Sequence, residues 1–126
     1  MKNIPKISDS EWQIMKVLWE KSPQTSSEII KALENETDWK PKTIQTLITR
    51  LVNKGAVTFE KENRTHLYNW SVSEDECIKY ESESFLKRVY KGSFGLMMVN
   101  FLQDHKLSVE EIEKLKNILN DDKDRG

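Results

Sequence analysis

The fold is decided by the stretch Lys40–Gly55, whose sequence is KPKTIQTLITRLVNKG. Pro41 suits the first position of a helix, because the N–H that it lacks would have no partner there. Gly55 suits the left-handed residue that ends a helix. Between them, apolar residues recur at the spacing of one helix face. These residues are Ile44, Leu47, Ile48 and Leu51. The stretch therefore predicts a helix with one buried face.

The opposite face of this predicted helix is basic and rich in hydrogen-bonding groups. The whole stretch contains no Asp or Glu, although 21 of the 126 residues are acidic. Such a helix suits a DNA groove, where its first residues meet the bases and later ones hold phosphates. Gln45 and Thr46 are expected at base edges, and Arg50 and Lys54 at phosphates. The predicted DNA contacts of the helix are Lys42, Thr43, Gln45, Thr46, Arg50 and Lys54.

Two capped helices are predicted ahead of this stretch. Ser8 with Glu11, and Thr25 with Glu28, have the spacing of a capping box, in which each side chain bonds the other residue's backbone N–H. The second of these helices is expected to end around Glu36. The inward stripe of the first helix is predicted to be Trp12, Met15, Leu18 and Trp19. The last two of the three helices form a helix–turn–helix pair.

Alternating residues after Gly55 predict a β-hairpin, with strands at 56–61 and 65–70 and a polar turn at 62–64. Three helices followed by a hairpin indicate a winged helix–turn–helix domain over residues 1–71. Lys61 and Arg64 at the tip are predicted to touch phosphates. The neighbouring Glu60 and Glu62 favour the alternative, a turn that meets only solvent.

The second half, residues 72–126, predicts a domain of three helices, with capping boxes at Ser73 and Ser108 and a frayed tail from Asp121. Its apolar stripes have no second layer in a segment of this length, so a two-fold homodimer is expected to cover them. Packing back onto the first domain is the alternative. The predicted dimerisation residues are Ile78, Phe85, Val89, Phe94, Met97, Met98, Phe101, Ile112, Leu115 and Leu119. The fold class is mainly α with a small β-hairpin wing.

Composition argues against an enzyme. The chain has one cysteine, two histidines and four isolated glycines, so it offers no disulfide, zinc cluster or phosphate loop. We expect no catalytic residues, metal, cofactor or small-molecule substrate. No apolar run approaches the roughly 20 residues of a membrane span, and the start lacks a signal-peptide core, which predicts a cytoplasmic protein. Residues 1–70 carry 11 Lys and Arg against 9 Asp and Glu, so a polyanion should meet this half.

The stretch from Trp39 to Leu51, followed by Lys54 and Gly55, resembles the recognition segment of the penicillinase repressors of the BlaI/MecI type. The sequences ISDSEW at 7–12 and MKVLW at 15–19 resemble the first helix of that family. FL at 85–86, VY at 89–90, VNFL at 99–102 and EEI at 110–112 resemble its dimerisation region. The resemblance covers nearly the whole chain.

This resemblance implies a dimeric repressor of palindromic operators at β-lactam resistance genes. It implies a membrane sensor metalloprotease as partner, which triggers cleavage between an Asn and a Phe, here Asn100 and Phe101. Lys40 stands where the family has Ser, and Gln45 where it often has Arg, so the preferred bases are open. A related branch senses copper through clustered cysteines, which Cys77 alone does not provide. The alternatives are a repressor of another operon, or a helical adaptor that binds an acidic protein.

Overall fold

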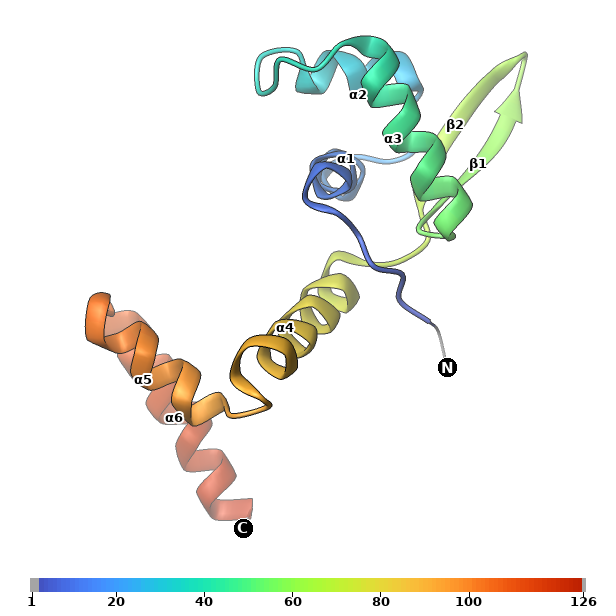
Figure 1. The fold of residues 1–126 in the computed structure, drawn as a ribbon. Helices are drawn as coiled ribbons and strands as arrows, with labels where there is room; N and C mark the ends of the chain where they lie inside the picture. Colours follow the sequence, from blue (N-terminus) through green and yellow to red (C-terminus); the bar gives the residue numbers. More distant parts are fainter. Residues whose placement is uncertain (1–2, 126) are drawn as a thin grey trace. The chain divides into compact units, whose positions relative to one another are not determined.

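The computed structural model describes residues 3–125 and forms two compact units, one reaching to Ser82 and the other beginning at Glu83. Helices and a β-hairpin make up the first unit, and helices make up the second (Figure 1). The mainly helical fold class with a two-stranded wing is confirmed. No helix of the described residues is long and apolar enough to cross a membrane.

The first unit begins with helices α1 (Asp9–Glu20), α2 (Ser26–Leu33) and α3 (Pro41–Lys54). Both predicted capping boxes are formed, with the Ser8 and Thr25 side chains accepting the N–H of the residue three positions later. Gly55 ends α3 in the left-handed conformation at φ 82°, as predicted. Helix α2 is shorter than expected, because the chain after Leu33 turns and bonds back to its carbonyl from Glu36 and Thr37.

Strands β1 (Val57–Glu62) and β2 (Thr65–Trp70) pair antiparallel, with Phe59 opposite Tyr68. The connection is the two residues Asn63 and Arg64, both at positive φ, which matches the twist of the two strands. Gln24 pairs with β2 as an isolated antiparallel bridge, because its backbone exchanges two hydrogen bonds with Tyr68. The hairpin is thereby tied to the segment between α1 and α2.

One apolar core holds the first unit together, and it collects the inner faces of α1, α2, α3 and the hairpin base. Its fully buried members include Ile14, Leu18, Ile29, Ile48 and Leu51. The inner stripe of α1 differs from the prediction: Met15 and Leu18 are buried, but Trp12 and Trp19 lie half-buried at its edge. Their indole rings meet edge to face with centroids 5.4 Å apart.

Helix α4 (Glu74–Tyr90) starts in the first unit and continues into the second. The first turns of α4 belong to the first unit, because Cys77 is buried in its core. Helices α5 (Phe94–Asp104) and α6 (Val109–Arg125) complete the second unit. The tail predicted to fray from Asp121 is helical through Arg125, and Gly126 lies outside the described residues.

Candidate nucleic-acid interface

Helix α3 presents the predicted polar face to solvent. Lys42, Thr43, Thr46 and Arg50 are exposed, Gln45 is half-buried, and the four apolar residues of the other face are buried. Within the described part of the chain, the charged groups of Lys42 and Arg50 have no ionic partner. The helix therefore offers two unpaired cations on a surface that its buried face holds in place.

Two threonines on this face have their hydroxyls occupied by the helix itself. Thr46 donates to the Lys42 carbonyl and Thr49 to the Gln45 carbonyl, each over 3.0 Å. A hydroxyl that is bonded back to the helix leaves the methyl group as the free part of the side chain. At the base edge where the sequence predicts Thr46, a free methyl group suits apolar contact with the methyl group of thymine. Thr49, which we did not place among the contacts, has the same geometry.

The N-terminus of α3 lacks a side-chain cap. Lys40 precedes it in an extended conformation and makes no side-chain cap hydrogen bond. Its carbonyl accepts from Thr43 and Ile44 inside the helix, but no side chain covers the first turn. Pro41 has no N–H and the N–H of Thr43 already bonds to the Lys40 carbonyl, which leaves the N–H of Lys42 for an anion.

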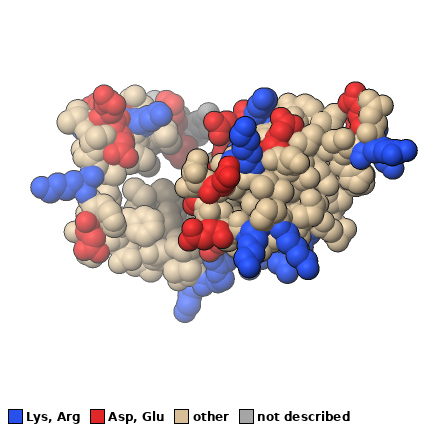
Figure 2. Space-filling model, turned by 90° about the horizontal axis from the view of Figure 1, so that it is seen from above, with Lys and Arg blue, Asp and Glu red and all other residues tan. Residues whose placement is uncertain are grey.

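The hairpin tip carries the two predicted wing residues, Lys61 and Arg64, both exposed. Glu60 and Glu62 are exposed beside them. On the face seen in Figure 2, Lys and Arg side chains are interspersed with Asp and Glu side chains and do not merge into one basic surface. On this face, attraction to a polyanion therefore comes from particular side chains and not from the net charge of the face.

Below the tip, an aromatic cluster stiffens the wing. The rings of Phe59 and His66 stack with centroids 4.5 Å apart, and His66 Nδ1 lies 3.4 Å from the Tyr68 hydroxyl. His66 is half-buried in β2. Among the described residues, no group of His, Cys, Asp and Glu is arranged to hold a metal ion.

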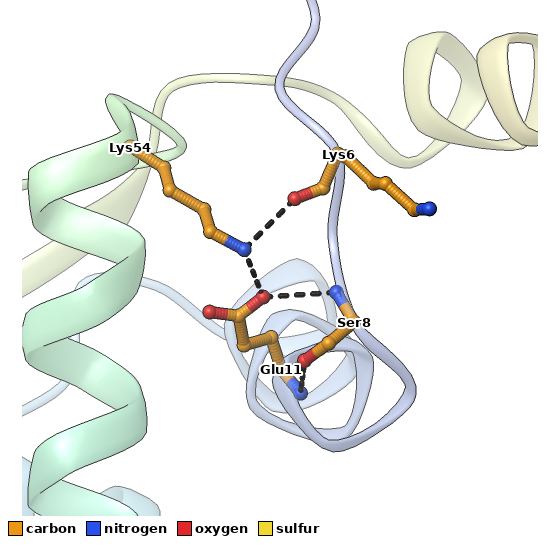
Figure 3. A network of polar contacts seen from close by, with 4 residues as sticks. All are labelled: Lys6, Ser8, Glu11 and Lys54. Atoms are coloured by element: carbon orange, nitrogen blue, oxygen red, sulfur yellow. Dashed lines mark hydrogen bonds and ion pairs between the residues drawn. The ribbon is translucent and has the colours of Figure 1, made fainter.

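Lys54, the last residue of α3, points toward Glu11 at the start of α1 and toward the backbone of Lys6 (Figure 3). Its Nζ lies 2.5 Å from Glu11 Oε1 and 2.9 Å from the Lys6 carbonyl oxygen. The sequence predicted a phosphate contact for Lys54, yet two oxygen atoms of the protein already bind its ammonium group. Glu11 was expected only as a helix cap, and its side chain is 2% exposed. No local sequence signal indicates a partner 43 positions away.

Glu11 gives the first unit a pH-dependent contribution to stability. Burial alone would raise the pKa of its carboxyl, but hydrogen bonds from Lys54 and Ser8 outweigh it and hold the pKa below the usual 4.5. The ionised form therefore favours the folded state. Its contribution is complete above the unfolded pKa and is lost as pH falls through the lower folded pKa.

We therefore expect the free energy of unfolding to fall more steeply with acid in the parent protein than in Glu11→Gln. Urea unfolding at a series of values between about pH 6 and pH 3 measures this difference. Glu28 and Glu111, whose pKa values are lowered by the capping residues Thr25 and Ser108, occur in both proteins and cancel. Parallel stability curves for the two proteins would contradict the expectation.

The predicted cleavage residues lie in α5. Asn100 and Phe101 are both exposed, and Asn100 Nδ2 donates to the Tyr90 hydroxyl over 2.9 Å. The Phe101 ring meets the Tyr90 ring edge-on with centroids 6.4 Å apart. The peptide bond between Asn100 and Phe101 thus lies inside a regular helix, and both residues contact Tyr90 at the end of α4.

None of the ten predicted dimerisation residues is buried. The exposed ones are Ile78, Val89, Phe94, Phe101, Ile112 and Leu119, and the half-buried ones are Phe85, Met97, Met98 and Leu115. Leu96, Val99 and Val109, which the prediction omitted, are also exposed. Between residues 83 and 122, where side-chain burial is described, no residue is buried at all. The second unit thus leaves its apolar side chains uncovered.

Two known proteins are similar to this chain over most of its length. The penicillinase repressor of Bacillus licheniformis is 45% identical over 125 residues, which cover 99% of this chain and 98% of the relative. The methicillin resistance regulatory protein MecI of Mammaliicoccus sciuri is 44% identical over 115 residues, or 90% of this chain and 93% of MecI. These relatives are transcriptional regulators and not enzymes.

A solved relative shows the same fold on DNA. The solution structure of the monomeric form of B. licheniformis BlaI in complex with the blaP half-operator matches with a TM-score of 0.53 and 45% identity. The match covers 60% of this chain and 93% of that one. The sequence profile of the penicillinase repressor family matches residues 7–121. With that profile and two relatives that each cover at least 90% of the chain in agreement, this chain belongs to the penicillinase repressor family.

Proposed function

We propose that the protein is a transcriptional repressor that binds operator DNA as a homodimer, with α3 in the major groove and the hairpin beside it. The observation that carries this proposal is the acid-free exposed face of α3, where Lys42 and Arg50 are unpaired over a buried apolar face. The BlaI complex with a half-operator supports it, because that protein is 45% identical to this one.

The proposed contacts divide by role. Gln45 and Thr46 read base edges, and Thr43 with the uncapped start of α3 meets the first phosphate or base. Arg50 lies further along the helix and holds a phosphate. The full set of proposed contacts is Lys42, Thr43, Gln45, Thr46, Arg50, Lys61 and Arg64. Phosphate contacts give affinity to any duplex, and the base contacts give the preference for the operator.

Alanine variants test these roles. Lys42→Ala and Arg50→Ala should weaken binding to every duplex and each reduce the slope of log affinity against log salt by about 1. Gln45→Ala should instead cost about 1–3 kcal/mol on the operator and little on random DNA. Fluorescence anisotropy with labelled duplexes over a salt series measures both. Lys116→Ala, an exposed lysine of α6, controls for loss of charge. Salt slopes equal to this control would refute the proposal.

The exposed apolar side chains of the second unit support the proposed homodimer. Those on α4, α5 and α6 are more than a lone helical segment can leave in water without associating. A second copy supplies an equivalent surface. One recognition helix reads only a few base pairs, so two copies on a palindromic site supply the specificity. Dimerisation is thus required for specific recognition of the operator.

Release of the operator is proposed to follow cleavage between Asn100 and Phe101, triggered by a membrane β-lactam sensor protease. Cleavage there would separate most of α5 from α6 and divide the proposed dimer surface. Because the bond lies inside a helix, local opening of α5 must come first. The names of the relatives, which concern penicillinase and methicillin resistance, support β-lactam resistance genes as the target. The site of action is then the cytoplasm.

A repressor of a different operon under similar control remains the second candidate. Gln45 favours it, because the family resemblance implies Arg at this base-reading position and a different side chain selects different bases. Selection of bound fragments from genomic DNA, followed by sequencing, distinguishes the two. A protein adaptor without DNA binding would instead enrich no fragment even at low salt.

A further inference from the structure

The end of α3 is fastened to the start of α1 by a polar contact that the recognition face does not use. Lys54 reaches from the last position of α3 to the Glu11 carboxylate and to the Lys6 carbonyl oxygen. Figure 3 shows the Lys6 side chain pointing away, so only its backbone takes part. Three segments distant in sequence therefore meet at one ammonium group.

The Glu11 carboxylate depends on this ammonium group. Its oxygen Oε1 accepts from Lys54 over 2.5 Å and from the Ser8 backbone N–H over 2.9 Å, and its side chain is 2% exposed. A carboxylate removed from water is strongly disfavoured unless a cation accompanies it. If Lys54 moved to a DNA phosphate, Glu11 would be left buried with its capping hydrogen bonds alone. One exposed phosphate contact returns less than that loss, so Lys54 should stay on Glu11 when DNA binds.

The contact between Lys54 and Glu11 lies at the C-terminal end of α3, on the same helix as the residues proposed to contact DNA. Arg50 is one helical turn before Lys54, and the base-reading residues Gln45 and Thr46 are two turns before it. The apolar face of α3 packs the middle of the helix against the core, from Ile44 to Leu51, and the contact of Lys54 fastens the last residue of the helix beyond that face. The ion pair is directional and joins α3 to α1 just before Gly55 turns the chain into β1.

We propose that Glu11 and Lys54 form a latch that fixes the position of α3 for base readout, so that Lys54 is a positioning residue and not a phosphate contact. The proposal rests on the function proposed above, in which α3 reads the operator. It gives a capping residue of α1 a role in DNA specificity. The best-attested use of a buried ion pair is to fix one arrangement of packed elements, which is the role proposed here for α1 and α3.

The test compares Lys54→Met and Glu11→Gln with Arg50→Ala, in full-length protein. Each is assayed for affinity to an operator and to a random duplex over a salt series, at a temperature where circular dichroism shows it folded. The latch variants should lose about tenfold in operator affinity, a loss typical of one broken charged contact. They should lose little on random DNA and keep the parent salt slope. Arg50→Ala should lose about 1 from that slope.

A phosphate role for Lys54 gives the opposite results. Lys54→Met would then lower the salt slope by about 1, as Arg50→Ala does. Glu11→Gln would raise affinity, because it frees the lysine and removes a negative charge. Either result overturns the latch, and so does unchanged operator affinity in both variants. If Arg50→Ala also changes nothing, the proposed function fails as well, which separates the two failures.

Two further measurements keep the test independent of folding. The double variant Glu11→Gln/Lys54→Met should bind no more weakly than the weaker single variant, because the two groups act as one unit. In the parent protein, the side-chain ammonium resonance of Lys54 should keep its chemical shift when operator is added, while that of Lys42 moves. A Lys54 shift that tracks that of Lys42 would overturn the latch without any mutation.

Discussion

Cleavage after Asn100 will lower the affinity for an operator with two half-sites by about 10²–10³-fold, and leave the affinity for one half-site nearly unchanged. The fragment 1–100 keeps the whole core of the first unit and the recognition helix. It loses α6 and the end of α5, which carry much of the exposed apolar surface. In a dimer, once one DNA-binding unit is bound, the other binds the second half-site in an intramolecular step. Two separate monomers each bind in an independent bimolecular step.

The matched control for this fragment is a chain that ends at Asn120, which retains every predicted dimerisation residue. Sedimentation velocity at tens of micromolar should find this control dimeric and the fragment 1–100 monomeric. Titrations of full and half operators then give the two affinities. If the fragment remains a dimer, or binds the full operator as tightly as the intact chain, the second unit does not supply the proposed pairing.

The largest effect on stability is expected from Ile48→Ala. Ile48 is 0% exposed in the middle of α3 and belongs to the core of the first unit. Removing a buried isoleucine side chain costs about 2–5 kcal/mol, from lost burial and from the cavity left behind. Small domains have only about 5–15 kcal/mol in total, so the variant should approach unfolding near body temperature. Operator binding should fail with the fold, although Ile48 does not face the DNA.

The neighbouring Thr49→Ala is the control for Ile48→Ala. Thr49 is exposed, and its hydroxyl bonds only to the Gln45 carbonyl of the same helix. Its loss should change the free energy of unfolding by no more than about 0.5 kcal/mol. Urea unfolding followed by tryptophan fluorescence measures both variants, because Trp12 and Trp19 lie at the edge of the core. Equal stabilities would mean that α3 is not held by its buried face.

Features encoded within a few residues were predicted well. Pro41 and Gly55 delimit α3 as expected, and the four Ser or Thr and Glu capping pairs all form both backbone contacts. A capping box is satisfied by two residues three positions apart, so its sequence is nearly sufficient evidence for its geometry. The hairpin and its Asn63-centred turn are equally local.

Features that join distant segments were not predicted. The sequence pattern identifies Glu11 as a cap but gives no sign that Lys54 neutralises it, because the pairing depends on how α1 and α3 cross. Gln24 bonding to Tyr68 is of the same kind. Helical periodicity placed Trp12 in the core, whereas packing turned α1 so that Ile14 took the central place. Cys77 likewise draws the start of α4 into the first unit.

The wing turn holds Arg64 in the left-handed conformation, at φ 71°. Glycine adopts that conformation freely at this point of a two-residue hairpin turn, whereas a residue with a side chain pays about 1–2 kcal/mol. The hairpin is therefore less stable with Arg64 than it would be with glycine at this position. In return, Arg64 places a guanidinium group at the tip of the hairpin. Local stability and charge placement conflict at this single position. Engineering guided by thermal stability alone would replace Arg64 first and would remove a proposed phosphate contact.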